Sequence, residues 1–258
     1  SQDIPATSDD QSIWPHLPLA SVIVLNYNTC EHLEACFHSL QQLIYPADRL
    51  ELILVDNAST DRSVEYMRAN FGQVKLICND KNYGFSQGNN IGVQNAQGEL
   101  IAFLNPDMRV DQRWLIELVE PLLTESKVAA TGSKILSWDG QTIDFAGGAA
   151  NFYGYGYQIG LGQSADTAYE PIPILFACGG AMLIRRQLFL EAGGFDEDFF
   201  AYYEDLDMGW RLWVLGYKVV LAPASVTDHI HHGAWRKVNE EKRRVLYERN
   251  ALLTMLKN

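Results

Sequence analysis

The sequence has little cysteine, no long apolar run and fewer basic than acidic residues. Its four cysteines among 258 residues form no C-x-x-C pair, which predicts buried free thiols in a reducing compartment. No segment approaches the ~20 consecutive apolar residues that span a bilayer, so we expect no transmembrane helix. The formal net charge of −12 argues against nucleic acid as a partner, because neutralising phosphates requires clustered Lys and Arg.

Two familiar nucleotide-binding loops are also missing. No G-x-G-x-x-G follows the first apolar run, and G-x-x-x-x-G-K-[ST] occurs nowhere in the chain. An acidic protein without such a loop can still bind a nucleotide if a divalent cation supplies the positive charge. A nucleotide site here would therefore depend on a carboxylate that holds the cation.

The first half of the chain alternates short apolar runs with amphipathic helical patterns. Strands that are apolar throughout, with helices between them, are typical of a parallel sheet covered on both faces. Right-handed crossovers then produce an α/β fold with a doubly wound, mostly parallel sheet. The expected strands are residues 21–25, 50–55, 74–78 and 99–104, and the expected helices are residues 30–43, 61–70, 86–95 and 112–123.

The second half has a different pattern. Residues 131–162 are rich in glycine and aromatic residues, which predicts hairpins and loops, and residues 163–173 predict a mobile connection. Regular structure is expected again over 174–184, in a helix over 204–215, in a short strand over 218–221 and in a helix over 238–256. A chain of this length and hydrophobic content favours one domain with elaborations.

Polar residues follow each of the first four predicted strands. Ligands bind at the carboxyl ends of the strands in an open parallel sheet, so these side chains describe one crevice. The alternative is that Asn and Asp cap helices and make turns, which accounts for about half of the positions. Asp107 is the best-placed residue to hold Mg²⁺ or Mn²⁺ on a diphosphate. The polar residues are Asn26, Asn28, Asp56, Asn57, Asn79, Asp80, Asn82, Asn105 and Asp107.

Two further clusters in the second half carry chemistry. Glu204, Asp205 and Asp207 open a predicted helix directly after a run of aromatic residues. Carboxylates at a helix N-terminus are stabilising, and a carboxylate desolvated by aromatic rings can also act as a general base. The segment from Asp228 to His232 contains three histidines in four positions, which favours a metal or phosphate contact without selecting the ligand.

Together these motifs resemble the family 2 glycosyltransferases of the GT-A fold, and most closely the rhamnosyltransferase-like members that build bacterial surface polysaccharides. The resemblance runs in the family's order from Ser21 to about Trp235. The residues that carry it are SVIVLNYN, LILVDNASTD, NYGFSQGNN, LIAFLNPD, GGAMLIRR, GGFDEDFFAYYEDLDMGWRLWVLGY and the late histidines.

The resemblance implies a role for particular positions. Asn105-Pro106-Asp107 occupies the family's D-x-D position, so Asp107 is implied to hold the metal, while Asn105 contributes no charge. Asp205 is implied to be the catalytic base of a Glu204–Asp205 pair. His229 is implied to bind the metal, with His231 or His232 as substitutes. The nucleotide-sugar site is implied to comprise Leu25, Tyr27, Asp56, Asn82, Gly84, Phe85, Asn105 and Asp107.

The resemblance further implies inverting transfer of a sugar, with rhamnose as a candidate, from a nucleoside-diphosphate donor to a glycan or lipid-linked saccharide, with Mn²⁺ or Mg²⁺ as cofactor. It implies a cytoplasmic enzyme, peripheral at the inner face of the membrane. The alternatives are a non-catalytic binding module and a sugar nucleotidyltransferase. The implied organisation is a flexible leader (1–18), a GT-A domain (19–235) with a nucleotide-sugar half (about 19–125) and an acceptor half (about 126–235), and a C-terminal helix (236–258).

That C-terminal segment is basic and amphipathic. It could lie on an anionic membrane, contact another domain or subunit, or pack its apolar face on its own domain, which we favour because few large aromatics could anchor it. Its basic residues are Arg236, Lys237, Lys242, Arg243, Arg244, Arg249 and Lys257, and its apolar positions include Val238, Val245, Leu246, Leu252, Leu253 and Leu256.

The aromatic residues of the middle segment have two interpretations. Phe152, Tyr153, Tyr155 and Tyr157 are more rings than a short loop needs, so they could stack on an acceptor sugar together with the loop at 163–173. They could equally form a small satellite core.

Overall fold

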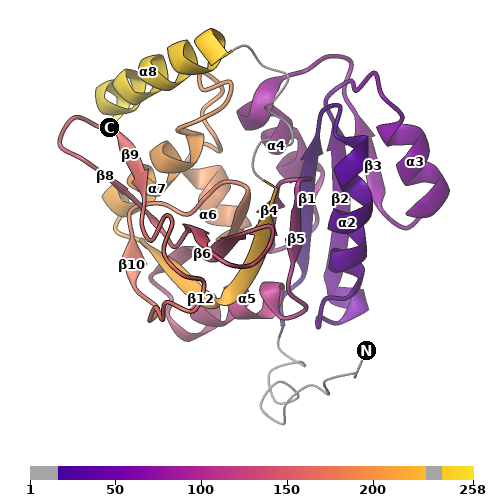
Figure 1. Ribbon diagram of the computed structural model, residues 1–258, viewed down its shortest axis with the longest axis horizontal. Coiled ribbons are helices and arrows are strands. Elements are labelled where there is room, and N and C mark those ends of the chain that lie inside the picture. The colour runs from indigo at the N-terminus through magenta and orange to yellow at the C-terminus, as the bar shows by residue number, and fades with distance from the viewer. Residues whose placement is uncertain (1–16, 231–239) are drawn as a thin grey trace.

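The computed structural model describes residues 17–230 and 240–258 (Figure 1). The predictions that concern His231, His232, Arg236, Lys237 and Val238, and the side chain of Lys242, lie outside the described residues. Residues 17 and 18 differ from the expectation of a flexible leader. Leu17 is buried in the core, and the Pro18 carbonyl accepts a hydrogen bond from the Tyr45 hydroxyl at 2.6 Å.

The predicted parallel sheet is present. Its strands β1 (Ala20–Asn26), β2 (Leu50–Asp56), β3 (Lys75–Cys78) and β4 (Leu100–Leu104) lie in the order β3-β2-β1-β4 and pair in parallel. Every residue of β4 is buried, because helices cover both faces of the sheet. This explains why the strands are apolar throughout instead of alternating.

The sheet continues beyond β4 with strands from the second half of the chain. Strand β11 (Ala181–Arg185) is antiparallel to both β4 and β6 (Val128–Ser137), and β12 (Lys218–His229) is parallel to β6. Strands β6 and β12 therefore run in the same direction as β1, and their carboxyl ends lie at the same edge. Short strands β10 (Pro173–Ile174) and β5 (Met108–Val110) pair with β12, and β7 (Ile143–Phe145) pairs with β6.

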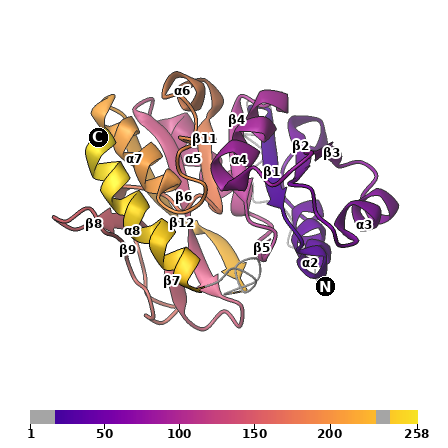
Figure 2. The same ribbon diagram turned by 90° about the horizontal axis from the view of Figure 1, so that it is seen from above.

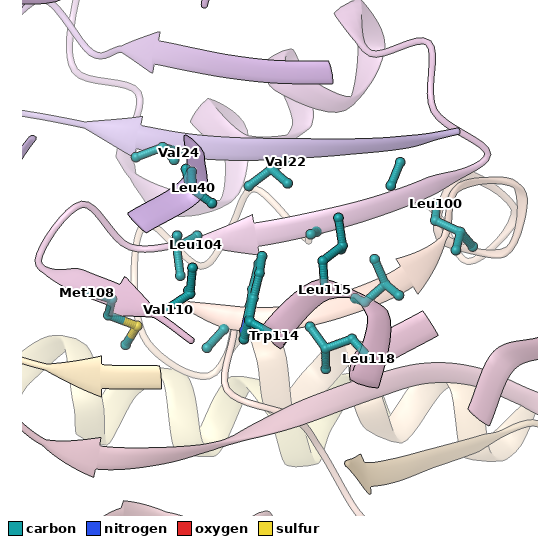
Figure 3. Close-up of a cluster of buried hydrophobic side chains, with 14 of the residues drawn as sticks. Val22, Val24, Leu40, Leu100, Leu104, Met108, Val110, Trp114, Leu115 and Leu118 are labelled. Carbon is teal, nitrogen blue, oxygen red and sulfur yellow. The ribbon is translucent and has the colours of Figure 1, made fainter. Parts of the chain in front are cut away.

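Helices cover the sheet on two sides, as the doubly wound fold predicts. On one face α2 (Cys30–Gln41) and α5 (Trp114–Thr124) pack on residues such as Val22 and Val24 (Figure 3), and α3 (Ser63–Asn70) belongs to the same core through Met67. On the other face α4 (Gly84–Asn95), α6 (Arg186–Glu191) and α7 (Glu204–Val214) pack on residues such as Ile23. The alternation of Val22, Ile23 and Val24 between two cores is the period-2 geometry of a strand.

The remaining elements lie outside these layers. A 3₁₀ turn, η2 (Ala47–Arg49), precedes β2. Strands β8 (Gly148–Ala150) and β9 (Gly156–Gln158) form a separate antiparallel hairpin. The final helix, α8 (Glu240–Lys257), lies beside α7 and this hairpin, on the opposite side of the molecule from α2 and α3 (Figure 2).

Two strands differ from the sequence prediction. The strand expected over 218–221 extends to His229, passing Pro223 through a register shift between Ala222 and Val226, which accommodates a residue that cannot donate to the ladder. Part of strand β6 lies in the segment that was expected to form loops. The polar residues of this part are buried and hydrogen-bonded, so they are compatible with a strand inside the sheet. Ser133 Oγ accepts from Trp114 Nε1 at 2.8 Å, and Thr131 Oγ1 donates to the Leu118 carbonyl at 2.8 Å. Helix α6 was not anticipated.

The four cysteines, all within the described part of the chain, are free thiols. Cys36 is buried as predicted, whereas Cys78 is exposed at the end of β3. It differs from the expectation because β3 lies at the edge of the sheet.

Candidate active site

A cleft of about 840 Å³ opens at the carboxyl ends of β1, β4 and β12 and at the start of α7. Its position agrees with the crevice expected from the polar strand ends. All of the predicted site residues except Asp56 line it. They are Leu25, Tyr27, Asn82, Gly84, Phe85, Asn105, Asp107, Glu204, Asp205 and His229.

Asp56 lies below the surface of the cleft. It is 3% exposed, and both of its carboxylate oxygens are bonded to the protein. Asn26 Nδ2 donates to Oδ1 at 2.7 Å, and the Ser59 amide donates to Oδ2 at 2.9 Å. The carboxylate therefore shapes the loop after β2, which is the turn-making role that the alternative interpretation gives to strand-end polar residues.

The loop that carries Asn82, Gly84 and Phe85 is fixed by its own hydrogen bonds. Asn82 Oδ1 accepts from the Gly84 amide at 2.8 Å, and Asn57 Nδ2 donates to the Gly84 carbonyl at 3.0 Å. Gly84 has a φ of +78°, and a Cβ there would lie 2.5 Å from the carbonyl oxygen of Phe200. Only glycine fits this close approach.

Asp107 and His229 come together because β5 pairs with the end of β12. His229 is opposite Met108 in this pairing, and the Ile230 amide donates to the Asp107 carbonyl at 2.9 Å. Asp107 Oδ2 lies 3.6 Å from His229 Nε2. Asp107 Oδ1 is buried and has no hydrogen-bond partner among the described residues. Asp107 and His229 both line the cleft, and one carboxylate oxygen of Asp107 remains without a partner among the described residues.

Asp144 is a neighbour of this pair that sequence reasoning missed. It is buried in β7, and its Oδ2 lies 3.4 Å from His229 Nδ1. Burial alone would lower the pKa of His229, but Asp107 and Asp144 outweigh it and raise this pKa to about 9. The signal that could have revealed Asp144 is a single aspartate between two apolar residues, Ile143 and Phe145.

Glu204 and Asp205 begin α7 and line the cleft. Asp205 Oδ2 accepts from the Gly179 amide at 3.0 Å, and its Oδ1 accepts from the Leu206 amide at 2.8 Å. Burial raises the pKa of Asp205, although these amides stabilise its ionised form. Glu204 is also buried, and burial together with the charges of Asp205 and Asp207 raises its pKa well above the usual range.

Asp207, the third carboxylate of this cluster, has a structural partner. Its Oδ2 accepts from Arg211 Nη2 at 2.6 Å and from Arg211 Nε at 2.9 Å. Asn258 Nδ2 donates to its Oδ1 at 2.8 Å. Asp207 therefore joins α7 to the end of α8 and does not line the cleft.

Helix α8 packs on its own domain. Ala251 is buried, Tyr155 Oη donates to Glu248 Oε2 at 2.7 Å, and Lys257 Nζ bonds Asp198 Oδ2 at 2.7 Å. Other residues of the same helix, Arg243, Leu246 and Tyr247, line the cleft. Within residues 17–230 and 240–258, no helix has the length and apolar content needed to cross a membrane.

The β8–β9 hairpin reaches the cleft with only part of its aromatic residues. Gly156, Tyr157 and Gln158 line the cleft. Phe152 is 92% exposed and Tyr153 is 71% exposed at the tip, so these rings do not form a satellite core. The loop at 163–173 contributes no residue to the lining of the cleft.

Comparison with known proteins places this geometry in a family. The chain is 27% identical over 237 residues to the N-acetylglucosaminyl-diphospho-decaprenol L-rhamnosyltransferase of Mycobacterium tuberculosis, covering 83% of this chain and 76% of that protein. It is 25% identical over 260 residues to the inactive polypeptide N-acetylgalactosaminyltransferase-like protein 5 of Macaca fascicularis, covering 92% of this chain and 58% of that protein. The chain thus spans less than two thirds of the macaque relative.

Solved structures share the fold. The crystal structure of GalNAc-T7 with UDP, GalNAc and Mn²⁺ superposes with a TM-score of 0.71 at 24% identity, covering 84% of this chain and 44% of that one. This likeness confirms the predicted GT-A fold. Residues 21–193, more than half of the chain, match the family described as Glycosyl transferase family 2. The chain therefore belongs to glycosyl transferase family 2.

Proposed function

We propose that this family 2 chain is a metal-dependent, inverting glycosyltransferase that moves a sugar from a nucleoside-diphosphate donor to a saccharide acceptor. The observation that carries the proposal is that one cleft holds the Asp107–His229 pair together with the half-buried carboxylate of Asp205. A glycosyl transfer reaction needs a site for the diphosphate and a base for the acceptor hydroxyl. The cleft supplies candidates for both.

The donor set of the Asp107–His229 pair suits a divalent cation. Asp107 offers a buried oxygen without a partner among the described residues, and His229 would offer an imidazole nitrogen once a cation displaces its proton. A cation held by these two residues would take its other ligands from phosphate and water. Mn²⁺ or Mg²⁺ bound here would stabilise negative charge on the departing diphosphate. Asp144 would orient His229 through its other ring nitrogen.

Asp205 is the proposed general base. The Gly179 amide, at 3.0 Å from Oδ2, holds the carboxylate in one orientation. Burial raises its pKa, which makes the ionised carboxylate a stronger base for the hydroxyl proton. The acceptor oxygen would then attack the anomeric carbon from the face opposite the diphosphate. General-base action of this kind contributes roughly 10²–10⁴-fold in rate.

The nucleotide is proposed to bind over the ends of β1 and β4. Leu25, Tyr27 and Asn105 line this part of the cleft, and Tyr27 is 44% exposed and available to contact a base. Asp56 is proposed to act through the loop it holds. The division into a nucleotide-sugar half (about 19–125) and an acceptor half (about 126–235) follows from this placement.

The acceptor is proposed to bind at the end of the cleft formed by β9 and α8. Tyr157, Phe176, Tyr202 and Tyr247 line this end, and aromatic faces suit the stacking of sugar rings. Hydrogen exchange with and without the acceptor would test this placement. Added protection of residues 155–158 by the acceptor is expected, and protection by the donor alone would contradict it.

Rhamnose is the first sugar to test, because the mycobacterial relative is named as a rhamnosyltransferase. The name of that relative also motivates the proposal that the acceptor is a lipid-linked saccharide. An enzyme with such an acceptor would be cytoplasmic and would lie at the inner face of a bacterial membrane. It would contribute to surface polysaccharide synthesis. Thermal-shift measurements with UDP-, GDP- and dTDP-sugars, each with Mn²⁺ or with EDTA, would identify the donor. Stabilisation by one class of nucleotide only when Mn²⁺ is present is expected.

A non-catalytic binding module is the second candidate, because the macaque relative is named inactive. Incubation of the stabilising nucleotide sugar with the protein and Mn²⁺ separates the two. An enzyme releases the nucleoside diphosphate slowly by hydrolysis and faster when an acceptor is added. Tight binding without any release would favour the binding module and contradict the proposed enzyme.

A further inference from the structure

The loop that precedes the Glu204–Asp205 pair is held from two sides. On the donor side, the Phe199 carbonyl accepts from Ser86 Oγ and the Phe200 carbonyl accepts from the Phe85 amide at 2.7 Å. Both donors belong to α4. This connection joins the nucleotide-sugar loop to the segment that carries the proposed base.

The next two carbonyls of this loop are bonded by a single side chain of α8. Asn250 Nδ2 donates to the Ala201 carbonyl at 2.9 Å and to the Tyr202 carbonyl at 2.8 Å. Asn250 is 0% exposed, so its two amide N–H groups are committed to these carbonyls and not to water. Two carbonyl acceptors also fix which end of the side-chain amide is the nitrogen.

The backbone here adopts a conformation that requires such support. Tyr202 and Tyr203 are consecutive non-glycine residues with φ values of 71° and 73°. Left-handed conformations of this kind persist only where the surroundings over-determine them. Tyr247 of α8 adds ring contacts to both residues, with centroids 5.8 Å and 4.8 Å away. The strained turn lies between Asn250 and the first residues of α7.

We infer that Asn250 is a positioning residue that holds the 201–203 turn so that Glu204 and Asp205 face the cleft. The inference rests on the proposed role of Asp205 and extends it to α8, a helix whose sequence favours packing on its own domain. Without the Asn250 amide, two carbonyls at the base of the cleft would lose their partners. The turn would then relax toward negative φ and carry the carboxylates with it.

The test compares Asn250→Ala and Asn250→Ser with Thr254→Val. Thr254 is a matched control, since it is equally buried in α8 and its hydroxyl donates to the Asn250 carbonyl within the helix. In Asn250→Ala, we expect kcat to fall by about 100-fold, as for a misplaced catalytic group. KM for the donor should stay within about twofold. Asn250→Ser keeps one hydrogen-bond donor, so its kcat should lie between those of Asn250→Ala and the wild type. This variant keeps the inference testable if Asn250→Ala does not fold.

Hydrogen exchange of residues 201–207 provides a readout that does not require turnover. Faster exchange there in both Asn250 variants, with the wild-type rate in Thr254→Val, is expected. Unchanged exchange and unchanged kcat in a folded Asn250 variant would overturn the inference. An equal loss in Thr254→Val would do the same, because it would assign the effect to packing of α8. If the wild type transfers no sugar, the proposed function fails while the exchange result still decides whether Asn250 holds the turn.

Discussion

Asp107 Oδ2 lies 3.6 Å from His229 Nε2, although the two residues come from opposite halves of the chain. The antiparallel pairing of β5 with the end of β12 produces this proximity, because it sets Met108 opposite His229. A cation site at this pair would depend on the pairing of β5 with β12. It also leaves Asp107 Oδ1 buried without a partner among the described residues, which is costly unless a ligand satisfies it.

Replacement of Asp107 by Asn should abolish Mn²⁺-dependent nucleotide binding. The amide keeps the shape of the side chain but removes the charge that attracts the cation. Calorimetric titration of UDP with Mn²⁺ present would measure the loss. Asp228→Asn is a suitable control, since Asp228 precedes His229 but pairs with Arg109 at 2.7 Å. Wild-type affinity in Asp107→Asn would remove this residue from the proposed metal site.

Asp144→Asn should weaken the same binding without abolishing it. The carboxylate faces the ring nitrogen of His229 that is directed away from Asp107, so it orients the imidazole and does not replace it as a ligand. Loss of such a partner typically costs about 10–100-fold in metal affinity. A titration of Mn²⁺ at saturating UDP would measure it, with Asp139→Asn in the preceding turn as the control. An effect as large as that of Asp107→Asn would instead indicate direct ligation.

Asp205→Asn should retain the fold and nucleotide binding but lose transfer by about 10²–10⁴-fold, the usual contribution of a general base. Asp207→Asn should do the reverse, lowering the melting temperature while turnover per folded molecule is kept, because Asp207 is bonded to Arg211. Melting curves and steady-state rates of both variants would separate the two carboxylates. Near-normal turnover in Asp205→Asn would move the role to Glu204.

The sequence predicted much of the first half of the chain and less of the second half. Apolar runs and amphipathic helical patterns reveal the type of an element locally, so β1 to β4 and the helices between them agreed with expectation. Strand β6 was not predicted in full, because Thr131 and Ser133 are polar. Their hydroxyls form hydrogen bonds with residues of α5. A sequence shows that these residues are polar but not that they have partners.

The candidate site could likewise be predicted only in part, because the sequence does not show which distant residues meet. Asp107 and Asp205 could be placed because each lies at the end of a recognisable strand or the start of a recognisable helix. Asp144 reaches His229 through the pairing of β7 with β6, and Arg243 reaches the cleft through the packing of α8. Asp56 fits the family pattern, and the sequence did not show that Asn26 at the end of β1 and Ser59 after β2 each donate to one of its oxygens.

Glu204→Gln should stabilise the protein at neutral and alkaline pH. Burial and the charges of Asp205 and Asp207 raise the pKa of Glu204 in the folded state, so the folded protein binds a proton that the unfolded chain has released. Below the pKa of the unfolded glutamate, the wild type and the variant should be equally stable. As the pH rises through the folded pKa, the wild type should lose about 1.4 kcal/mol for each pH unit that separates the two values.

Melting temperatures of wild type and Glu204→Gln across a range of pH would measure this difference. A gap that opens with rising pH is expected, and a constant gap would show that Glu204 is not a buried acid with a raised pKa.

The activity of the wild type should be lost on acidification at a higher pH than an ordinary aspartate would give, because burial raises the pKa of Asp205 as well.

The last prediction concerns the outer face of α8. Val245 is 60%, Leu252 is 64% and Leu256 is 84% exposed, so the helix packs one side on the domain and leaves apolar side chains on the other. Basic residues near an anionic leaflet contribute about 1 kcal/mol each, but Lys257 is already paired with Asp196 and Asp198. The overall charge of −12 opposes the approach as well.

We therefore predict weak, peripheral binding to anionic vesicles at low salt, lost at about 0.15 M salt as screening shortens the range of the attraction. Flotation with anionic and with neutral vesicles would measure it. The double change Leu252→Glu and Leu256→Glu should abolish binding while transfer to a soluble acceptor is kept. Equal recovery of the wild type and this variant with anionic vesicles at low salt would remove α8 from any membrane contact.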